Sequence, residues 1–352
     1  MQYSYDACPG AEATIGRHQA LIAEAVSSVL PADVLKAIVM IGGYGRDEGG
    51  YVQADDGSFQ PYNDYDYFLV LDNVSRRQAR ELIADLPHLD DAVGIEVDFH
   101  PLLVKDLPHL ELSLMNAEMA AGHRVIWGDP DILRDMPEMP LCSVPLAEFS
   151  RMMVNRGCLL LMNYLNPQRK DFSKYINKNY LAIGDARLAL AKINLLHYQD
   201  KREMLAIHTL DSTLTRNYGQ AIDARFRPDR MPAWPQSELP LVTGCWLNLF
   251  SELESLRLDN VVSSSGLGWR EYAEPSLLKH QGDENPWRNL GRCVLDSKLS
   301  LASGFALRHP RERIASGLPL LLSEARQLSN PAADAGWCQR ARALLEIWQR
   351  YS

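Results

Sequence analysis

The chain reads VLKAIVMIGGYGRDEG at residues 34–49 and NDYDYFLVL at residues 63–71. Both stretches contain a run of β-branched, aromatic and other apolar residues, which predicts a buried β-strand in each. The first run ends at Gly42 and Gly43, and glycines at this point favour a tight turn directly after the strand. A third run, GIEVDFHPLL at residues 94–103, alternates in polarity and predicts another strand. These three strands are expected to form the centre of a small β-sheet.

Helical patterns alternate with these strands in the first half of the chain. The elements predicted there are a helix at 12–30, strands at 34–41 and 65–71, a helix at 75–86, a strand at 94–103, a helix at 110–121 and a strand at 124–127. Ser75 is expected to cap its helix, because a serine side chain accepts hydrogen bonds from the first helical turn. This order of elements predicts an α/β module in which helices pack on a small sheet.

A different pattern begins after the proline-rich stretch DMPEMPLCSVP at residues 135–145. Strand-like runs are scarce from there on. Long helical patterns occupy residues 146–165, 173–199, 241–258 and a group from about 290 to 350. We therefore expect an α+β protein, with a small mixed β-sheet and flanking helices in residues 1–140 and a mostly α-helical domain in residues 141–352.

The composition of the chain limits the classes of protein that it can represent. Its 352 residues, 46 % of them hydrophobic, suffice for two folded domains and contain no apolar run long enough to cross a membrane. The six cysteines are scattered and form no Cys-x-x-Cys pair, so neither a disulfide framework nor a zinc site is indicated. The first residues lack the basic-then-apolar pattern of a secretory signal. These observations predict a cytoplasmic protein with free thiols and no membrane partner.

The charges are divided unevenly along the chain. Residues 1–150 contain 9 Lys and Arg against 25 Asp and Glu, whereas residues 151–352 contain 27 against 20. The net charge of −9 argues against a protein that coats long nucleic acid, which would need a broad basic face. The uneven division is compatible with chance and surface solubility. It is also compatible with a site in which one half supplies carboxylates for a metal and the other supplies cations for phosphate.

Three aspartates lie on or beside the predicted strands. Asp64 and Asp66 are two residues apart, so on a strand their side chains point to the same face. Two adjacent carboxylates repel one another unless a counter-charge lies between them, and a divalent cation supplies it. Asp98 would complete the set from a neighbouring strand, although Glu96 shares its face and is an alternative. Carboxylate oxygens favour magnesium or manganese over zinc.

Each motif taken alone has a simpler interpretation. An Asp-x-Asp pair is commonly a pair of solvated strand-end aspartates, and a glycine-rich turn is commonly a plain turn. The stretch at residues 42–49 is not a Walker A loop, because no Gly-Lys-Ser or Gly-Lys-Thr follows it. It also lacks the glycine spacing and the later ribose-binding acid of a dinucleotide-binding fold. The motifs become informative because they occur together and in a particular order.

Together these motifs resemble the nucleotidyltransferase superfamily of the DNA polymerase β type. The pattern of that family is an apolar strand, Gly-Gly or Gly-Ser, a spacer, Asp-x-Asp on the next strand and a third acidic residue on a later strand. The residues that match it are Gly42, Gly43, Asp64, Asp66 and Asp98. Residues 42–48 also resemble the Gly-x-x-Gly-Arg-x-Glu extension of minimal and aminoglycoside-type members, with Arg46 as the arginine. The resemblance covers residues 12–130, about a third of the chain.

This resemblance implies a metal-dependent enzyme that moves a nucleoside monophosphate from a nucleoside triphosphate to an acceptor hydroxyl and releases pyrophosphate. It implies two Mg²⁺ or Mn²⁺ ions held by Asp64, Asp66 and Asp98, which would also be the catalytic residues. Nucleotide contacts are implied for the two glycines and for Arg46. The acceptor is expected to be a small molecule, such as a sugar or an antibiotic.

The segment between the glycines and the Asp-x-Asp pair departs from the pattern of the family. The spacer between Gly43 and Asp64 is 20 residues long, which is more than the family usually has. Its central residues 54–58, Ala-Asp-Asp-Gly-Ser, are typical of a turn. We therefore expect residues 51–62 to form a small hairpin inserted at the rim of the site.

A stripe of charged residues is predicted on the helix at 173–199. Its members, which lie within about 40° of one another at ~100° per residue, are Lys174, Lys178, Asp185 and Lys192. The simplest interpretation of such a stripe is a solvated helix face. A functional interpretation is that Lys178, together with Lys174, binds the β- and γ-phosphates of the nucleotide, as basic residues of the helical domain do in related transferases.

Two other functions stay open from the sequence. A catalytically silent nucleotide-binding or antitoxin-like interaction protein could use the same fold, although the presence of all three aspartates favours the enzyme. A nucleotidyltransferase could also modify a protein or an RNA, and the basic second half of the chain keeps this alternative open. The sequence identifies neither the acceptor nor the preferred base.

Overall fold

The computed structural model describes residues 2–259, 266–282, 284–296 and 304–351, together with Val262 and Leu299. The α+β class predicted from the sequence is confirmed, with a small mixed sheet followed by a helical region. Contacts divide the chain into two units. The first unit consists of Met1–Val144, Asn194–Glu203 and Ile222–Met231, and the second consists of Pro145–Ile193, Met204–Ala221 and Pro232–Ser352. Two short segments that the predicted boundaries assign to the helical domain thus belong to the first unit.

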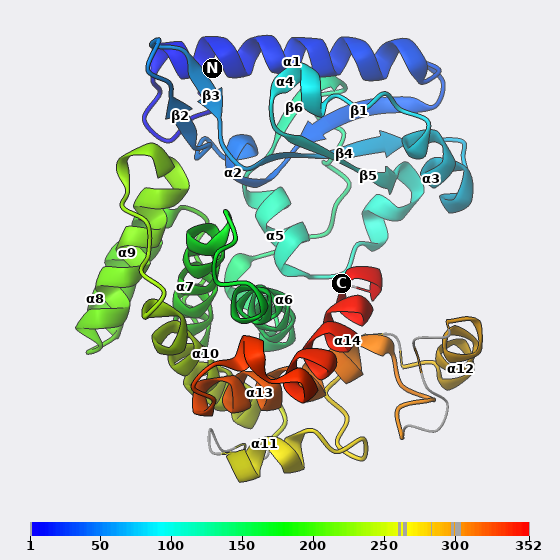
Figure 1. The fold of residues 1–352 in the computed structure, drawn as a ribbon. Helices are drawn as coiled ribbons and strands as arrows, with labels where there is room; N and C mark the ends of the chain where they lie inside the picture. The colour runs from blue at the N-terminus through cyan, green and yellow to red at the C-terminus, as the bar shows by residue number, and fades with distance from the viewer. Residues whose placement is uncertain are drawn as a thin grey trace. The chain divides into compact units, whose positions relative to one another are not determined.

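The first unit is built on a four-stranded sheet with the strand order β5-β4-β1-β6 (Figure 1). The strands are β1 Leu35–Met40, β4 Asp64–Leu71, β5 Glu96–Leu103 and β6 Arg124–Gly128. β1 is antiparallel to β4 and to β6, whereas β4 and β5 are parallel, so the sheet is mixed. Each of these strands was predicted from the sequence.

Helices cover both faces of this sheet. The helical elements of the first unit are α1 Pro9–Val29, α2 Gly42–Gly45, α3 Arg76–Ala84, α4 Asp90–Val93 and α5 Leu114–Ala121, with 3₁₀ turns η1 Val104–His109, η2 Leu141–Ser143 and η3 Pro228–Arg230. α1 runs along one face, and α5 lies on the opposite face (Figure 1). The predicted cap of α3 is confirmed, because Ser75 Oγ accepts from the Gln78 N–H and the Gln78 side chain accepts from the Ser75 N–H.

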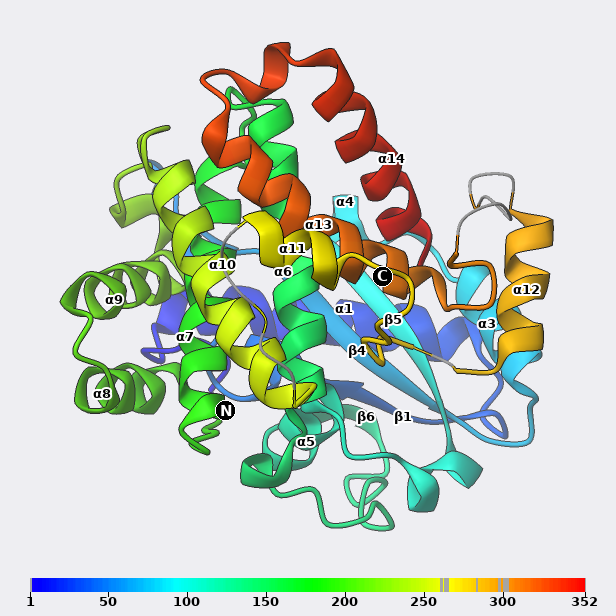
Figure 2. The same cartoon turned by 90° about the horizontal axis from the view of Figure 1, so that it is seen from below.

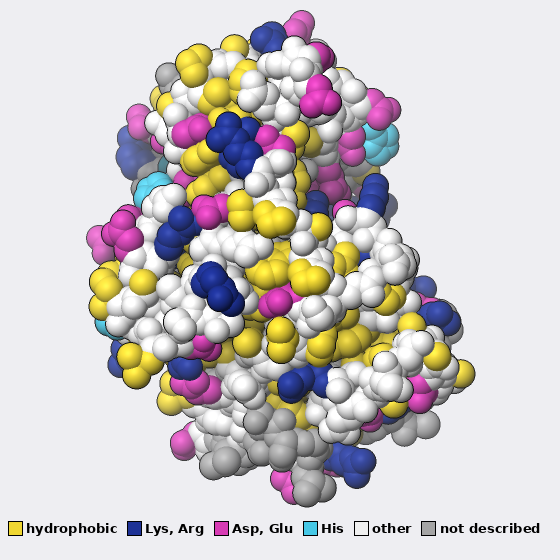
Figure 3. Space-filling view, turned by 60° about the vertical axis from the view of Figure 1, so that its left-hand side comes forward, with side chains coloured by type: hydrophobic (Ala, Val, Ile, Leu, Met, Phe, Trp, Pro, Cys, Tyr) yellow, Lys and Arg dark blue, Asp and Glu magenta, His cyan; other side chains and the backbone are white. Residues whose placement is uncertain are grey.

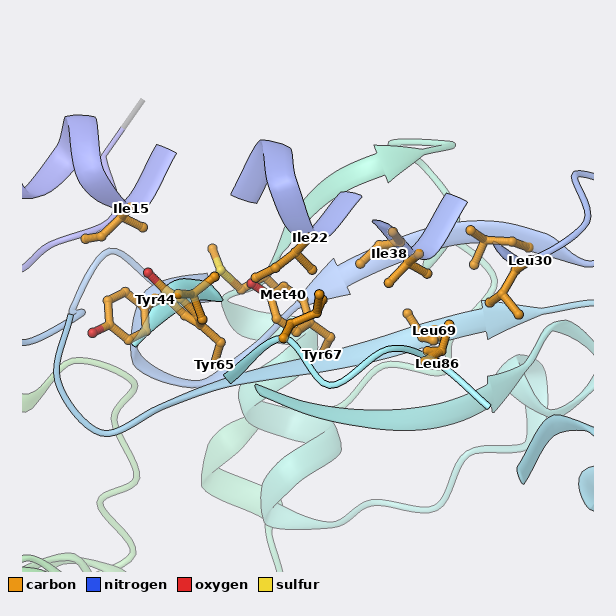
Figure 4. Close-up of a cluster of buried hydrophobic side chains, with 14 of the residues drawn as sticks. Ile15, Ile22, Leu30, Ile38, Met40, Tyr44, Tyr65, Tyr67, Leu69 and Leu86 are labelled. Atoms are coloured by element: carbon orange, nitrogen blue, oxygen red, sulfur yellow. The ribbon is translucent and has the colours of Figure 1, made fainter. Parts of the chain in front are cut away.

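Alternation along the strands separates two apolar clusters. The cluster under α1 includes Ile15 and Ile22 of that helix (Figure 4), and its β4 members are Tyr65, Tyr67, Leu69 and Leu71. The cluster on the opposite face contains Phe68 of β4, Leu102 of β5 and Met119 of α5. Odd-numbered residues of β4 and β5 therefore face α1, and even-numbered residues face α5.

The long spacer forms the predicted hairpin. β2 Tyr51–Gln53 pairs antiparallel with β3 Phe59–Pro61. At its tip, Asp56 Oδ1 accepts hydrogen bonds from the Ser58 N–H at 2.9 Å and from its hydroxyl at 2.6 Å. Gly57 in the same turn has φ of +82°, a conformation in which glycine is favoured. The insertion is thus a defined element of the first unit.

The second unit is helical. Its elements include α6 Leu146–Leu165, α7 Phe172–Leu190, α10 Glu238–Arg257, α11 Gly266–Tyr272, α12 Pro286–Leu295, α13 Pro310–Gln327, η4 Pro331–Ala333 and α14 Ala335–Tyr351. α6 packs against α7, α10 and α13 (Figure 2). Trp246 of α10 is fully buried in this packing, and its indole N–H donates to the Met153 carbonyl at 2.9 Å. Within the described residues, no helix is both long and apolar enough to span a membrane.

The helix predicted at 173–199 is shorter in the structure, because α7 ends at Leu190. Lys192 has φ of +59°, and its N–H donates to the Ala189 carbonyl while the Ile193 N–H donates to the Leu188 carbonyl, both at 2.9 Å. These two bonds form a Schellman motif, which terminates a helix. Lys192 is therefore not on the helical stripe that the sequence predicts. A separate helix, α8 Tyr198–His208, follows, and α9 Ser212–Phe226 comes next; neither was predicted as such.

Lys279 is a fully buried cation in the second unit. Its Nζ donates to the carbonyl of Glu274 at 2.9 Å and to that of Leu277 at 2.7 Å, and it lies 5.1 Å from the centre of the Tyr272 ring. Burial lowers the pKa of Lys279 to about 8, although the negative charge of Glu312 acts in the opposite direction. An exposed lysine in the unfolded chain has a pKa of about 10.4.

We expect the wild-type protein to gain stability relative to a Lys279→Met variant as the pH rises from about 8 towards about 10.4. In that window the unfolded state holds the Lys279 proton and the folded state does not, so raising the pH favours the folded state. Urea denaturation of both proteins at several pH values measures the difference in their free energies of unfolding. A difference that stays constant across this window would contradict the assignment.

Candidate functional site

The three predicted aspartates lie on one face of the sheet. The parallel register of β4 and β5 places Asp66 opposite Asp98 and Asp64 opposite Glu96. The three aspartates are even-numbered, so they share the face on which α5 packs. All three are partly buried, whereas Glu96 is exposed. The structure thus brings the three aspartates to neighbouring positions on adjacent strands.

Negative charge accumulates at these positions. Burial raises the pKa of Asp98; the charge of His100 opposes this, and the negative charges of Asp64 and Asp90 add to it. The side-chain amide of Asn63 donates to Asp64 Oδ1. A cation bound here would therefore lower the free-energy cost of burying the charged form of Asp98 and would offset its repulsion by Asp64.

The aspartates do not form a complete metal cage. Among the residues that the structure describes, no group of three or more His, Cys, Asp or Glu side chains is arranged to hold a metal ion. Mg²⁺, however, is usually bound by one or two carboxylates together with waters and substrate phosphates. The carboxylate donors of the aspartates therefore fit a hard cation whose coordination a substrate completes.

The glycine turn lies directly beside Asp66. Gly42–Gly45 forms α2, a single helical turn after β1, and Gly42 has φ of +69°. A Cβ atom at Gly42 would lie 2.9 Å from Asp66 Oδ2. The Ile41 N–H donates to the Asp66 carbonyl at 2.9 Å, which fixes the start of the turn to β4. The positive φ favours glycine at this position, and a ligand at the turn would lie next to the carboxylate.

An arginine from a distant part of the sequence lies on the neighbouring glycine. Arg225 belongs to the last turn of α9, in the segment Ile222–Met231 of the first unit. A Cβ atom at Gly43 would lie 2.9 Å from Arg225 Nη2. Within the described part of the chain, the Arg225 side chain makes no hydrogen bond or ion pair, and its Nε is buried without a partner. The charge of Arg225 is therefore available to an anion at the turn.

Tyr198 gathers three cations beside the turn. The distances from its ring centre are 5.5 Å to Arg46 Cζ, 4.8 Å to Lys201 Nζ and 5.0 Å to Arg225 Cζ. Its N–H donates to Glu48 Oε1 at 2.7 Å, which attaches the segment Asn194–Glu203 to the end of the glycine stretch. The aromatic ring thus packs against the cations and holds them in a small volume.

Two carboxylates balance part of this positive charge. Arg46 Nε lies 3.1 Å from Glu48 and its Nη1 lies 2.9 Å from Glu118, while Lys201 Nζ lies 3.9 Å from Glu118. Burial by itself raises the pKa of Glu118, but the charges of Arg46, Lys201 and Arg225 hold it below its usual value. Of the three cations around Tyr198, Arg225 is the one outside these ion pairs.

Arg46, which was predicted to contact the nucleotide, is buried and ion-paired in the structure. Arg46 is only 6 % exposed, and its guanidinium is ion-paired on two sides. These ion pairs occupy guanidinium donors that a nucleotide contact would otherwise use. The sequence alone could not show this, because Glu118 is 72 residues away along the chain.

Lys178 lies on α7 in the second unit, with Lys174 one turn before it. The residues described around the glycine turn all belong to the first unit. The sequence reasoning missed Arg225, Tyr198 and Lys201. The sequence signal for Arg225 is modest: an Arg-Phe-Arg sequence at residues 225–227 that is followed by Pro228.

Comparisons of the chain with protein-family models, with curated proteins and with solved structures found no match. The function is therefore inferred from the chemistry of the residues around the glycine turn.

Proposed function

We propose that the first unit binds a nucleoside triphosphate with divalent cations and transfers its nucleotidyl group to the hydroxyl of a small acceptor molecule. One observation carries this proposal. The turn at Gly42 and Gly43 has the Asp66 carboxylate against its first glycine and the Arg225 guanidinium against its second. A glycine turn between an acid and a cation suits a ligand that is both phosphorylated and metal-bound.

The aspartates supply the ligands for the cations in this proposal. Asp64, Asp66 and Asp98 would hold Mg²⁺ or Mn²⁺ through their carboxylate oxygens, and phosphate oxygens would complete the coordination. Two bound ions would neutralise the phosphates and stabilise the attacking and leaving oxygens. The space beside each glycine is bounded by a charged side chain, Asp66 at Gly42 and Arg225 at Gly43, so a phosphate bound at the turn would meet both groups.

The residues of the chain divide the remaining work. The acceptor oxygen attacks the α-phosphorus, the bond from that phosphorus to the bridging oxygen breaks, and pyrophosphate leaves with the electron pair. Asp98 would accept the proton of the acceptor hydroxyl. Arg225 would balance the charge on the β- and γ-phosphates, the role that the sequence suggests for Lys178.

The acceptor is proposed to be small because the face drawn in Figure 3 offers little for a polyanion. On the face in Figure 3, Lys and Arg side chains are interspersed with acidic, apolar and uncharged ones. A protein that binds nucleic acid along its backbone would instead present a continuous basic stripe.

A nucleotide-binding protein without catalysis is the second candidate. It is favoured by one observation: across the described ranges, the acidic residues form no three-ligand metal group. Such a protein would bind a nucleoside triphosphate through the glycine turn and Arg225 and release it unchanged.

Incubation with each of the four α-labelled nucleoside triphosphates, with Mg²⁺ or Mn²⁺ and a metabolite extract, separates these functions. Transfer of label to an extract component together with release of pyrophosphate supports the enzyme. Nucleotide binding without pyrophosphate release identifies the second candidate. If the protein neither binds nor turns over any of the four nucleotides, both proposals are wrong.

A further inference from the structure

The β2–β3 hairpin is joined to the glycine turn through one hydroxyl. Tyr44, within the turn, donates from its hydroxyl to the Gly50 carbonyl at 2.6 Å and accepts from the Tyr62 N–H at 2.8 Å. Gly50 and Tyr62 are the residues that flank the hairpin on either side. Burial raises the pKa of Tyr44, so its hydroxyl stays protonated and can donate. The base of the hairpin is therefore fixed to the turn.

The same base lies directly against the main chain of Arg225. A Cβ atom at Gly50 would lie 2.1 Å from the Arg225 carbonyl oxygen and 3.2 Å from that of Phe226. No side chain can occupy this position unless one of the two backbones moves. The backbone at Gly50 thus determines how closely the end of α9 approaches the turn.

Aromatic and charged side chains also fix the position of the residues that follow Arg225. The Arg227 guanidinium lies 4.7 Å from the centre of the Tyr51 ring and donates to both carboxylate oxygens of Asp229, at 3.0 and 2.7 Å. Tyr5 stacks on Phe226 with the ring centres 4.5 Å apart. The segment Ile222–Met231 is therefore packed against the hairpin and the N-terminal residues of the same unit.

These contacts form a closed path from the glycine turn through Tyr44, Gly50 and the Arg225 main chain, and back through the Arg225 guanidinium to Gly43. We propose that the inserted hairpin is a positioning device: by way of Tyr44 and Gly50 it holds Arg225 at the place where it meets the terminal phosphates of the nucleotide. This inference rests on the proposed function. Tyr44 and Gly50 are positioning residues in it, because they act through Arg225 and do not touch the phosphates themselves.

Gly50→Ala tests the device, because the added methyl group must change the distance between the Gly50 and Arg225 backbones. The probes are inorganic tripolyphosphate and the four nucleoside triphosphates, each titrated with Mg²⁺ by calorimetry. We expect Gly50→Ala and Tyr44→Phe to weaken binding by about ten-fold, within the range for coupled neighbours. Gly16→Ala is the matched control, because a Cβ atom there meets nothing within 4 Å, and its affinity should equal that of the wild type.

The Arg225→Ala background separates positioning from general damage. If Gly50 acts through Arg225, Gly50→Ala causes no further loss of affinity once Arg225 has been replaced. A loss of the same size in both backgrounds, or wild-type affinity in both Gly50→Ala and Tyr44→Phe, overturns the positioning role and leaves the proposed function intact. Failure of the wild-type protein to bind any probe overturns the proposed function and this inference with it. Thermal unfolding checks each variant, and Tyr44→Phe decides the question if Gly50→Ala does not fold.

Discussion

Replacing Asp66 by Asn is expected to lower nucleotidyl transfer by about 10³-fold or more, because loss of one metal-binding carboxylate removes several kcal/mol of charge stabilisation. The position is sensitive because Asp66 lies opposite Asp98 in the strand register and its Oδ2 lies against Gly42. The fold should persist, since an amide fits the same space and one negative charge fewer relieves repulsion between the aspartates. Turnover at saturating Mg²⁺ and circular dichroism measure the two effects.

Asp91→Asn is the matched control for this experiment. Asp91 is an exposed aspartate of α4 in the same unit, and we expect its replacement to leave turnover unchanged. Full activity in Asp66→Asn would show that the carboxylates on this face are not the metal ligands.

Replacing Arg225 by Ala is expected to weaken binding of a nucleoside triphosphate by about 1.5–3 kcal/mol, the range for a hydrogen bond to a charged group. The reason is that Arg46 and Lys201 form ion pairs with carboxylates, whereas Arg225, the third cation at the Tyr198 ring, forms no ion pair within the described residues. Arg225→Lys should recover part of the affinity, since it keeps the charge and loses the planar fork of donors. Calorimetric titration with Mg²⁺ present measures each affinity.

Two further variants complete this comparison. Arg230→Ala removes an exposed arginine from the same segment of the first unit and should leave the affinity unchanged. Lys178→Ala tests the contact suggested by the helical stripe, which predicts a loss of similar size. Equal affinities of Arg225→Ala and the wild type would remove Arg225 from the phosphate site.

Short-range patterns predicted the elements that carry the aspartates. Side-chain alternation along one strand predicts that Asp64 and Asp66 share a face. That Asp98 lies opposite Asp66 depends on the register between β4 and β5, which only the structure gives. The turn at Gly42 was also readable, because few residues other than glycine adopt its conformation. The cap at Ser75 was readable for the same kind of local reason.

Long-range contacts decided the features that the sequence did not show. Arg225 meets Gly43 across more than half of the chain, and no local pattern encodes that approach. The ion pair between Arg46 and Glu118 joins residues far apart in the sequence and could not be predicted from a local pattern. The end of α7 was missed because Lys192, and not the usual glycine, takes the left-handed conformation that closes the helix.

The path of the chain through the first unit also affects its synthesis. Residues 194–203 and 222–231 complete this unit, but they are translated after α6 and α7 of the other one. Domains generally fold as units, from the N-terminus onwards, while the ribosome adds roughly 5–20 residues per second. For some seconds after their synthesis, residues 1–144 therefore lack Tyr198, and during that time Arg46 and Glu118 are not covered by its ring. A nascent chain released at residue 144 would contain Asp64, Asp66 and Asp98 but not Arg225.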